Sequence, residues 1–339
     1  MKTRIVGFGE VMARLSPPPG EPLGSSPALL TWYGGAEANA AAAVAQLGGD
    51  AALVTTLPAS ALGRGARAAL AARGVDVTHT RFSEKGRLGL YFASFGACVQ
   101  PPEVHYDREN SAFALDPEPV DLAGALDSAA ILHISGVTPA VSARAGAAAL
   151  AAARGAAARG VKVSFDGNYR GKLWAARGED GRGVLRDLLS LASIAFIDHR
   201  DLALILGEAF AGESAAQKNR GAFQRALAAF PRLELVCATD RTVLSIDRHD
   251  LGGFAQQRGG EFIACTPIAI SGIIDRIGAG DAFAGAFLLS VMRGAKTEDA
   301  LRTSLYAGAA KHGQRGDMLT ITADELAALV GAPSLDVRR

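Results

Sequence analysis

The sequence predicts an α/β fold, in which a doubly wound, mostly parallel sheet carries helices on both faces and a small β-sheet lid is added. Three observations support this prediction. Short apolar runs alternate with alanine-rich helical stretches along most of the chain. Glycines follow several of these stretches as helix stop signals. Two proline-containing segments interrupt the alternation.

The elements of the large sheet follow one another as strand, then helix. The expected strands are residues 5–8, 51–55, 131–135, 161–166, 194–197 and 233–237. The expected helices are residues 36–47, 62–73, 141–159, 279–293 and 297–312. This repetition places the core in residues 1–9, 34–85 and 112–330, with parallel strands buried between two helical layers.

Two insertions, residues 10–33 and 86–111, form the expected lid. The first contains the run from Pro17 to Gly20 and no helical period. The second carries strand-like runs at 88–95 and 104–108. We expect them to build a small antiparallel sheet over a cleft of the large domain. Residues 331–339 are expected to be a frayed tail.

Composition excludes several classes of partner. The 35 basic and 34 acidic residues leave a net charge of +1, so the chain has no electrostatic footprint for nucleic acid or an anionic membrane. No run of about 18 apolar residues suggests a membrane span. Cys98, Cys237 and Cys265 show no disulfide or zinc spacing, and the N-terminal run resembles a strand rather than a signal peptide. We therefore expect a cytoplasmic protein.

A glycine-rich turn at Gly278, Ala279, Gly280 and Asp281 opens a helix of small residues and phenylalanines. Free backbone N–H groups at a helix N-terminus, unobstructed by side chains, bind the charge of a transferring phosphoryl group. Asp281 at this place can accept the proton of an attacking hydroxyl group. The alternative is an ordinary glycine turn with a capping aspartate.

A second glycine pair, Gly34 and Gly35, precedes the first long helix, and Asn39 lies in that helix's first turn. Glycines let a ligand approach the backbone, although a plain strand-to-helix turn has the same pattern. Both glycine sites open helices of one doubly wound domain, where ligands gather at the carboxyl ends of the strands.

Together, Gly-Gly-x-x-x-Asn and Asp-x-x-Gly-Ala-Gly-Asp resemble the signatures of the ribokinase/phosphofructokinase-B family of carbohydrate kinases, from Ile5 to about Leu329. The resemblance implies a ribokinase-like core with a β lid, Asp281 as catalytic base, and the 278–281 backbone as anion hole. It also implies ATP as phosphate donor, Mg²⁺ bridging the phosphates without a dedicated protein cage, and a homo-oligomer paired through the lids.

Two further segments bear on the acceptor. Tyr91, Tyr106 and Arg108 lie on the expected lid strands, where hydroxyls and a guanidinium suit a polyhydroxylated carboxylate. At the end of an expected strand, Asp166 and Asn168 are expected to face the cleft, and Arg170 adds a second cation. The alternative is that the tyrosines belong to the lid core and the arginines are solvated or ion-paired.

As a set, these residues resemble the 2-keto-3-deoxygluconate kinase subfamily. That resemblance implies substrate contacts at Gly35, Tyr91, Tyr106, Arg108, Arg170, Asp281 and Asp317. The implied reaction converts ATP and 2-keto-3-deoxygluconate to the 6-phosphate. Asp317 also fits an ordinary Gly-Asp turn.

The nucleotide side departs from the family pattern. Asp198 and Asp201 stand where many members have Asn-x-x-Glu, and the segment from Thr239 to Arg241 replaces a Lys-x-Gly-x-x-Gly element. We expect nucleotide contacts from Asp198, Thr239, Arg241, Asp275, Arg276, Gly278 and Gly280. Arg276 either contacts phosphate or fills part of a monovalent-cation region; which residues hold a metal is left open.

Three other functions remain for comparison. A kinase for fructose or another neutral sugar needs no substrate-binding arginine, and a non-catalytic sugar sensor needs no intact nucleotide site. An NAD-dependent oxidoreductase needs Gly-x-Gly-x-x-Gly after the first strand, whereas Gly7 and Gly9 lead into Glu10 and the proline-rich insertion.

Overall fold

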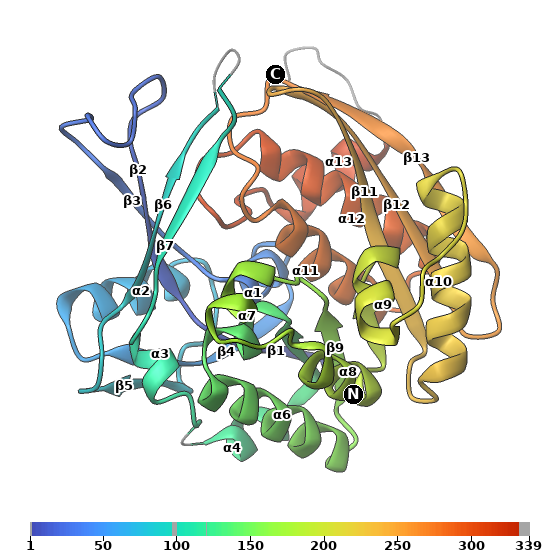
Figure 1. The fold of residues 1–339 in the computed structure, drawn as a ribbon, viewed down its shortest axis with the longest axis horizontal. Helices are drawn as coiled ribbons and strands as arrows, with labels where there is room; N and C mark the ends of the chain where they lie inside the picture. Colours follow the sequence, from blue (N-terminus) through green and yellow to red (C-terminus); the bar gives the residue numbers. More distant parts are fainter. Residues whose placement is uncertain (1, 97–99, 120, 332–339) are drawn as a thin grey trace.

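A nine-stranded sheet with the order β13–β12–β11–β10–β9–β8–β1–β4–β5 forms the centre of the computed structural model, which describes residues 2–96, 100–119 and 121–331 (Figure 1). The strands are β1 (Arg4–Phe8), β4 (Asp50–Pro58), β5 (Thr80–Ser83), β8 (Ala129–Ser135), β9 (Lys162–Asp166), β10 (Ile194–Phe196), β11 (Leu235–Ser245), β12 (Arg248–Gln257) and β13 (Phe262–Ser271). From β5 to β11 every neighbouring pair is parallel, which confirms the predicted sheet.

The last two strands were not predicted. The expected strand at 233–237 continues as β11 to Ser245, and β12 and β13 return antiparallel to it. The outer half of β11, residues 239–245, is largely exposed and polar at its start, so its sequence resembles a loop. This antiparallel ribbon extends beyond the parallel sheet on the opposite side of α11 from the small sheet (Figure 1).

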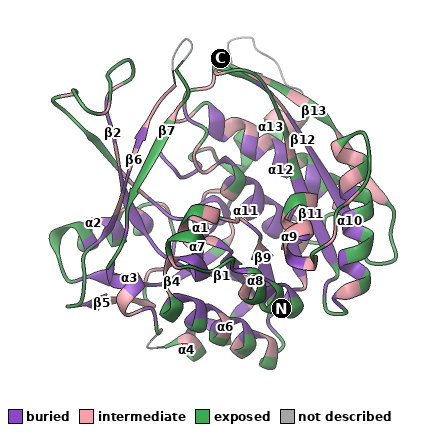
Figure 2. Cartoon of the chain, in the orientation of Figure 1, coloured by how far each residue is buried: buried purple, intermediate pink, exposed green. Residues whose placement is uncertain are grey.

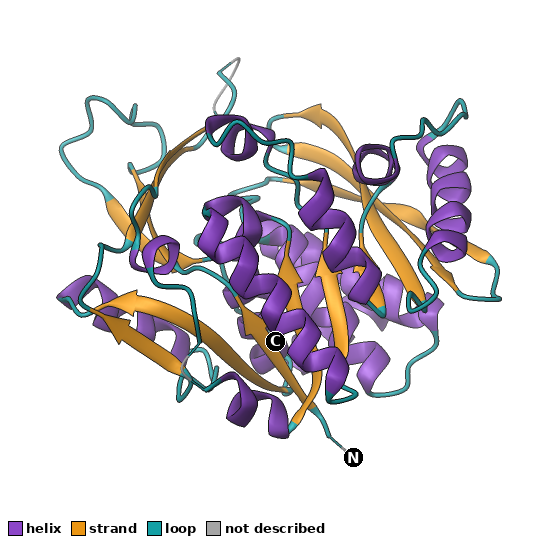
Figure 3. Cartoon of the chain, turned by 60° about the horizontal axis from the view of Figure 1, so that its bottom comes forward, coloured by secondary structure: helices purple, strands orange, loops and turns teal. Residues whose placement is uncertain are grey.

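Helices cover both faces of the large sheet, as predicted (Figure 3). One layer contains α1 (Ala36–Gln46), α2 (Ala61–Ala71), α11 (Ala279–Met292), α12 (Thr297–His312) and α13 (Ala323–Gly331). The other contains α3 (Ala112–Leu115), α4 (Leu122–Asp127), α5 (Val137–Val141), α6 (Ala143–Ala158), α7 (Gly171–Ala176), α8 (Arg182–Leu191), α9 (His199–Leu206) and α10 (Ala215–Ala229).

The core has two parts because successive residues of a strand point to opposite faces. In β1, Ile5 belongs to the part of the core that contains residues of α1 and α11, whereas Val6 belongs to the part that contains residues of α6. Both strand residues are almost fully buried, and the buried elements of both layers are seen in Figure 2. The Ala-rich α6 presents small buried side chains, which let this helix lie close to the sheet.

The expected lid segments form a separate four-stranded sheet, called here the small sheet, in the order β3–β2–β6–β7. Its strands are β2 (Met12–Ser16), β3 (Leu30–Gly34), β6 (Gly89–Ser94) and β7 (Glu103–Asp107). The prediction of a purely antiparallel sheet is wrong, because β2 and β6 are parallel. The chain leaves the large sheet after β1 and after β5, which run in the same direction, so the two strands that follow also share one direction.

The remaining expectations concern the cysteines, the C-terminal residues, the pairing of subunits and membrane-spanning segments. Cys98 and residues 332–339 lie outside the described residues. Cys237 and Cys265 are free. β7 is an edge strand whose five residues are all exposed, and pairing of subunits through it stays a prediction. Among the described helices, none combines the length and apolar character required to span a bilayer.

Candidate active site

A cavity of about 450 Å³ lies between the small sheet and the carboxyl ends of β8 and β9. In a doubly wound sheet this is the expected ligand position, because the chain turns in opposite directions from β1. The residues predicted from the sequence that line this cavity are Gly35, Asn39, Tyr91, Tyr106, Arg108, Asp166, Asn168, Arg170, Arg241, Arg276, Gly278, Gly280, Asp281 and Asp317.

A second cavity, of about 400 Å³, adjoins the first. It is lined by the predicted residues Asp198, Thr239 and Ala279, together with Arg241, Arg276 and Gly280, which line both cavities. The start of α11 therefore separates two chambers. Such an arrangement can hold two substrates with their reacting groups at one helix N-terminus.

Asp281 lies in the first turn of α11 and is partly exposed to the first cavity. Burial raises the pKa of its carboxyl group to about 6, against the hydrogen bond from Asn39 and the charges of Arg170 and Lys311. Asn39 Nδ2 donates this hydrogen bond to Asp281 Oδ2 over 2.7 Å. A carboxylate with such a pKa is a stronger base than an exposed aspartate and is still ionised at neutral pH.

The backbone around Asp281 leaves donors for an anion. The first N–H groups of a helix have no partner within the helix. Within the described chain, the Gly280 and Asp281 N–H groups donate to no other residue, whereas Ala279 N–H donates to Arg276 O over 3.3 Å. The helix dipole adds partial positive charge at the same place.

Two of the predicted glycines are required by their surroundings. Gly278 has φ = 83°, and a Cβ atom there would lie 1.8 Å from the carbonyl oxygen of Asp317. A Cβ atom at Gly35 would lie 2.0 Å from the carbonyl oxygen of Glu10. Both turns are therefore packed against other backbone segments that line the first cavity.

A group of carboxyl groups surrounds Asp281. Burial raises the pKa of Glu37 to about 7, that of Asp201 to about 7, and that of Asp166 well above its ordinary value. After burial, repulsion from Asp281 and then from Asp201 is the main cause at Asp166. Glu37 was not predicted, although it lies between Gly35 and Asn39 in the sequence. Its Oε1 accepts hydrogen bonds from Ser135 N–H and the Thr138 hydroxyl.

The arginines of the site differ in their partners. Arg108 is buried and bonded to Glu10, with Nε 2.9 Å from Glu10 Oε2, so its charge is already compensated. Among the described residues, no side-chain hydrogen bond or ion pair involves Arg170, Arg241 or Arg276, all of which are exposed to the cavities. Burial, followed by repulsion from Arg276 and Arg200, lowers the pKa of Arg241. The charge of Arg170 acts on the carboxyl groups of Asp166, Asp201 and Asp281, whereas Arg241 and Arg276 face both chambers without a bonded carboxylate in the described part of the chain.

Known proteins match this chain over almost its whole length. Residues 2–324 match the model of the pfkB family carbohydrate kinases. The chain belongs to the pfkB family of carbohydrate kinases. It is 32% identical over 329 residues to the 2-dehydro-3-deoxygalactonokinase of Haloferax volcanii, covering 96% of each chain.

Solved structures agree with this assignment. The 2-dehydro-3-deoxygluconokinase of Thermotoga maritima superposes with a TM-score of 0.88 at 30% identity, covering 97% of this chain and 100% of that one. A pfkB family carbohydrate kinase from Listeria grayi superposes with a TM-score of 0.90, also at 30% identity and with the same coverage. The prediction of a ribokinase-like kinase fold from the glycine signatures is confirmed.

Three predicted residues of this pfkB kinase have other contacts than expected. Asp317 lines the first cavity, but its carboxylate accepts hydrogen bonds from the Tyr91 hydroxyl and from Arg14. Gly34 packs against the Asp317 side chain and lines neither chamber. Asp275 is buried and bonded to Arg14, and it also lines neither chamber, so its position gives no support to a nucleotide contact.

Several residues of the site escaped sequence reasoning because their partners are far away in the chain. Glu10, Arg14 and Lys311 are charged residues in otherwise apolar runs, which is the one local signal they carry. All three are buried in the structure. Lys311 Nζ donates to the carbonyl oxygen of Gln314 over 3.0 Å and lies 3.5 Å from that of Asp275.

Proposed function

We propose that this pfkB kinase transfers the terminal phosphate of ATP to 2-keto-3-deoxygluconate and releases its 6-phosphate. The observation that carries the proposal is the place of Asp281, beside the free N–H groups of α11, where the two chambers meet. The unpaired Arg170 in the first chamber supports an acceptor that carries a carboxylate. The names of two relatives, a deoxygalactonokinase and a deoxygluconokinase, support the same class of sugar acid.

In this proposal the acceptor occupies the first chamber and the nucleotide the second. Asp281 orients the acceptor hydroxyl and takes its proton as the bond from the hydroxyl oxygen to the terminal phosphorus forms and the bond from that phosphorus to ADP breaks. The N–H groups of Gly280 and Asp281 stabilise the charge that develops on the transferred group. Arg276 and Arg241, which line both chambers, neutralise the phosphate chain between donor and acceptor.

The residues present fit Mg²⁺ as the companion of the nucleotide. Asp166, Asp198 and Asp201 line a third cavity of about 210 Å³, which also reaches Gly280. Within the described ranges, no three His, Cys, Asp or Glu side chains are arranged to hold a metal on their own. One or two of these carboxylates would hold a hydrated Mg²⁺ beside the phosphates of the nucleotide, which agrees with both observations. The ion would supply charge neutralisation of the phosphates.

The proposal is tested by ADP release from the purified full chain with a panel of acceptors. The panel contains 2-keto-3-deoxygluconate, its epimer 2-keto-3-deoxygalactonate, fructose and ribose, each in K⁺ and in a bulky organic cation. We expect the highest kcat/KM with a keto-deoxy sugar acid. Preference for fructose would leave a neutral-sugar kinase, and no turnover with any acceptor would favour a sugar sensor.

Replacing Arg170 by Gln should raise KM for the sugar acid about 10- to 100-fold, because one charge-assisted hydrogen bond is lost. The rate with a neutral acceptor should change far less. Steady-state kinetics with both acceptors measure the difference. Lys172→Gln removes a neighbouring exposed charge that does not line the cavity and serves as the matched control. Equal losses with both acceptors would contradict the role of Arg170 in binding the carboxylate.

The pH dependence follows from the pKa of Asp281, which is raised to about 6. The base is active when deprotonated, so kcat/KM for the acceptor at saturating MgATP should be level near neutral pH. It should fall as the pH decreases below about 6 and approach a tenfold loss per unit. An ordinary aspartate would place this limb near pH 4. A rate that stays constant from neutral pH down to about 5 would contradict the raised pKa.

A further inference from the structure

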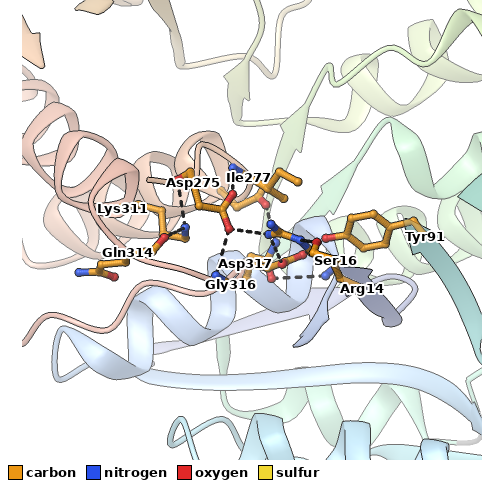
Figure 4. A network of polar contacts seen from close by, with 12 residues as sticks. Arg14, Ser16, Tyr91, Asp275, Ile277, Lys311, Gln314, Gly316 and Asp317 are labelled. Atoms are coloured by element: carbon orange, nitrogen blue, oxygen red, sulfur yellow. Dashed lines mark hydrogen bonds and ion pairs between the residues drawn. The ribbon is translucent and has the colours of Figure 1, made fainter. Parts of the chain in front are cut away.

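The side chain of Arg14, on β2 of the small sheet, is fully buried yet charged. Its Nη1 lies 2.7 Å from Asp275 Oδ2 and 3.0 Å from Asp317 Oδ1, as Figure 4 shows. Its Nε donates to Ser16 Oγ over 3.0 Å. One guanidinium group thus joins the small sheet to two carboxylates from the C-terminal part of the chain.

The first carboxylate belongs to the segment that leads into α11. Asp275 accepts hydrogen bonds from the N–H groups of Ile277 and Gly316, each over 3.0 Å, so it fixes the turn just before Gly278 (Figure 4). Lys311 lies beside the main-chain oxygen of the same residue. The start of α11, with the donors assigned above to the phosphoryl group, therefore depends on Asp275 keeping its place.

The second carboxylate belongs to the acceptor chamber. Asp317 lines that chamber, accepts a hydrogen bond from the Tyr91 hydroxyl on β6, and packs its main chain against Gly278. Arg14 favours the ionised form of Asp317, against the burial that raises the pKa of this carboxyl group. The same cation therefore contacts one residue of the chamber wall and one residue that positions the phosphoryl site.

Arg14 itself lines neither chamber. It borders a separate, mostly apolar cavity of about 290 Å³, and its guanidinium lies 5.2 Å from the Trp32 ring and 5.3 Å from the Phe95 ring. A buried ion pair is weak evidence for stability, since well-packed apolar residues often serve a fold as well. A cation in this place is better explained by the geometry that it imposes on two carboxylates.

We propose that Arg14 is a positioning residue for phosphoryl transfer, which holds the segment before α11 and Asp317 in register with the small sheet. The inference rests on the proposed function for its kinetic readout only. The inference predicts that the anion-binding turn before α11 and the small sheet hold each other in place through the charge of Arg14.

The first test uses Arg14→Ala, with wild-type turnover established beforehand. We expect kcat/KM to fall about 100-fold, as for a displacement of the reacting groups by about 1 Å. Millimolar guanidinium should restore activity severalfold, because the adjoining cavity leads to the vacated position. Urea, which has a similar shape and no charge, should restore none. Arg14→Lys, which keeps the charge but loses the Nε–H group that donates to Ser16 Oγ, should be intermediate.

Arg144→Ala removes an exposed arginine that pairs with exposed Glu118 and lines neither chamber, and it should leave activity unchanged with or without guanidinium. Normal activity in folded Arg14→Ala would overturn the proposal. A low activity of Arg14→Ala that guanidinium does not restore, together with an equally low activity of Arg14→Lys, would also overturn it, because that result indicates a packing role alone.

A second readout does not depend on the substrate. Amide hydrogen exchange should become faster at residues 275–281 in Arg14→Ala, and guanidinium should reverse the change. If the wild type turns over no acceptor, the proposed function fails, while this exchange result still decides the inference. Faster exchange confined to the small sheet, with residues 275–281 unaltered, would overturn it.

Discussion

Asp281→Asn should lower kcat about 1,000-fold while changing KM for either substrate little, because general base catalysis contributes about 100- to 10,000-fold. The variant keeps the shape of the side chain and an oxygen that can accept the bond from Asn39 Nδ2, but it cannot take a proton. Steady-state ADP release measures the loss, which corresponds to about 4 kcal/mol of transition-state stabilisation.

The thermal stability of Asp281→Asn should increase, although its activity decreases. Burial disfavours the charged form of Asp281, so above about pH 6 the folded state holds an ionised group that would be more stable in water. Removing the charge should therefore raise Tm at neutral pH and change it less in acid. Asp187→Asn, at an exposed position of α8, is the control for both measurements. An active Asp281→Asn enzyme cannot be reconciled with a base at this position.

Gly278→Ala should have the second large effect, on folding and on activity together. The residue has φ = 83°, and its new Cβ atom would lie 1.8 Å from the carbonyl oxygen of Asp317. The left-handed backbone costs about 1–2 kcal/mol for a non-glycine residue, and relief of the overlap costs about 1–3 kcal/mol more. Urea unfolding should show this loss, and kcat should fall at least about 100-fold because the start of α11 is displaced.

Gly183→Ala provides the matched comparison. This glycine is the second residue of α8, and a Cβ atom there meets no atom within 4 Å. Alanine should stabilise the helix by no more than about 0.5–1 kcal/mol, the value for the middle of a helix, and leave kcat unchanged. If Gly278→Ala behaved like Gly183→Ala, the turn before α11 would be more adaptable than its contacts indicate.

Local patterns were sufficient for most elements of the fold and for the centre of the site. The glycine turns before α1 and α11 are local signals, and the βαβ rule places both at one edge of the sheet. The parallel pairing of β2 with β6 joins segments far apart in the chain, and no local pattern records it. The outer part of β11 was not predicted for another reason, because its residues are largely exposed and show no alternation of buried and exposed positions.

Charge pairing was the weakest part of the sequence reasoning. The motif around Arg108 left open whether this arginine contacts the substrate or is ion-paired, and in the structure it lines the first cavity and is paired with Glu10, which precedes the small sheet. Asp275 belongs to the recognised signature, yet its carboxylate is bonded to Arg14. Whether a charged residue meets a ligand or another side chain depends on tertiary contacts that composition and spacing do not contain.

The place of β1 has a consequence for synthesis. This first strand lies in the interior of the large sheet, between β8 and β4, and its α1 neighbour is covered by α11 from near the other end of the chain. A chain leaves the ribosome with its N-terminus first, and a domain folds as a unit. The apolar face of α1 therefore waits for residues 279–292, and the site, which unites Glu10 with Asp317, is completed last. Contacts of such long sequence separation also slow refolding of the released chain. Shortened chains that end before α11 should expose this face and aggregate rather than retain partial activity.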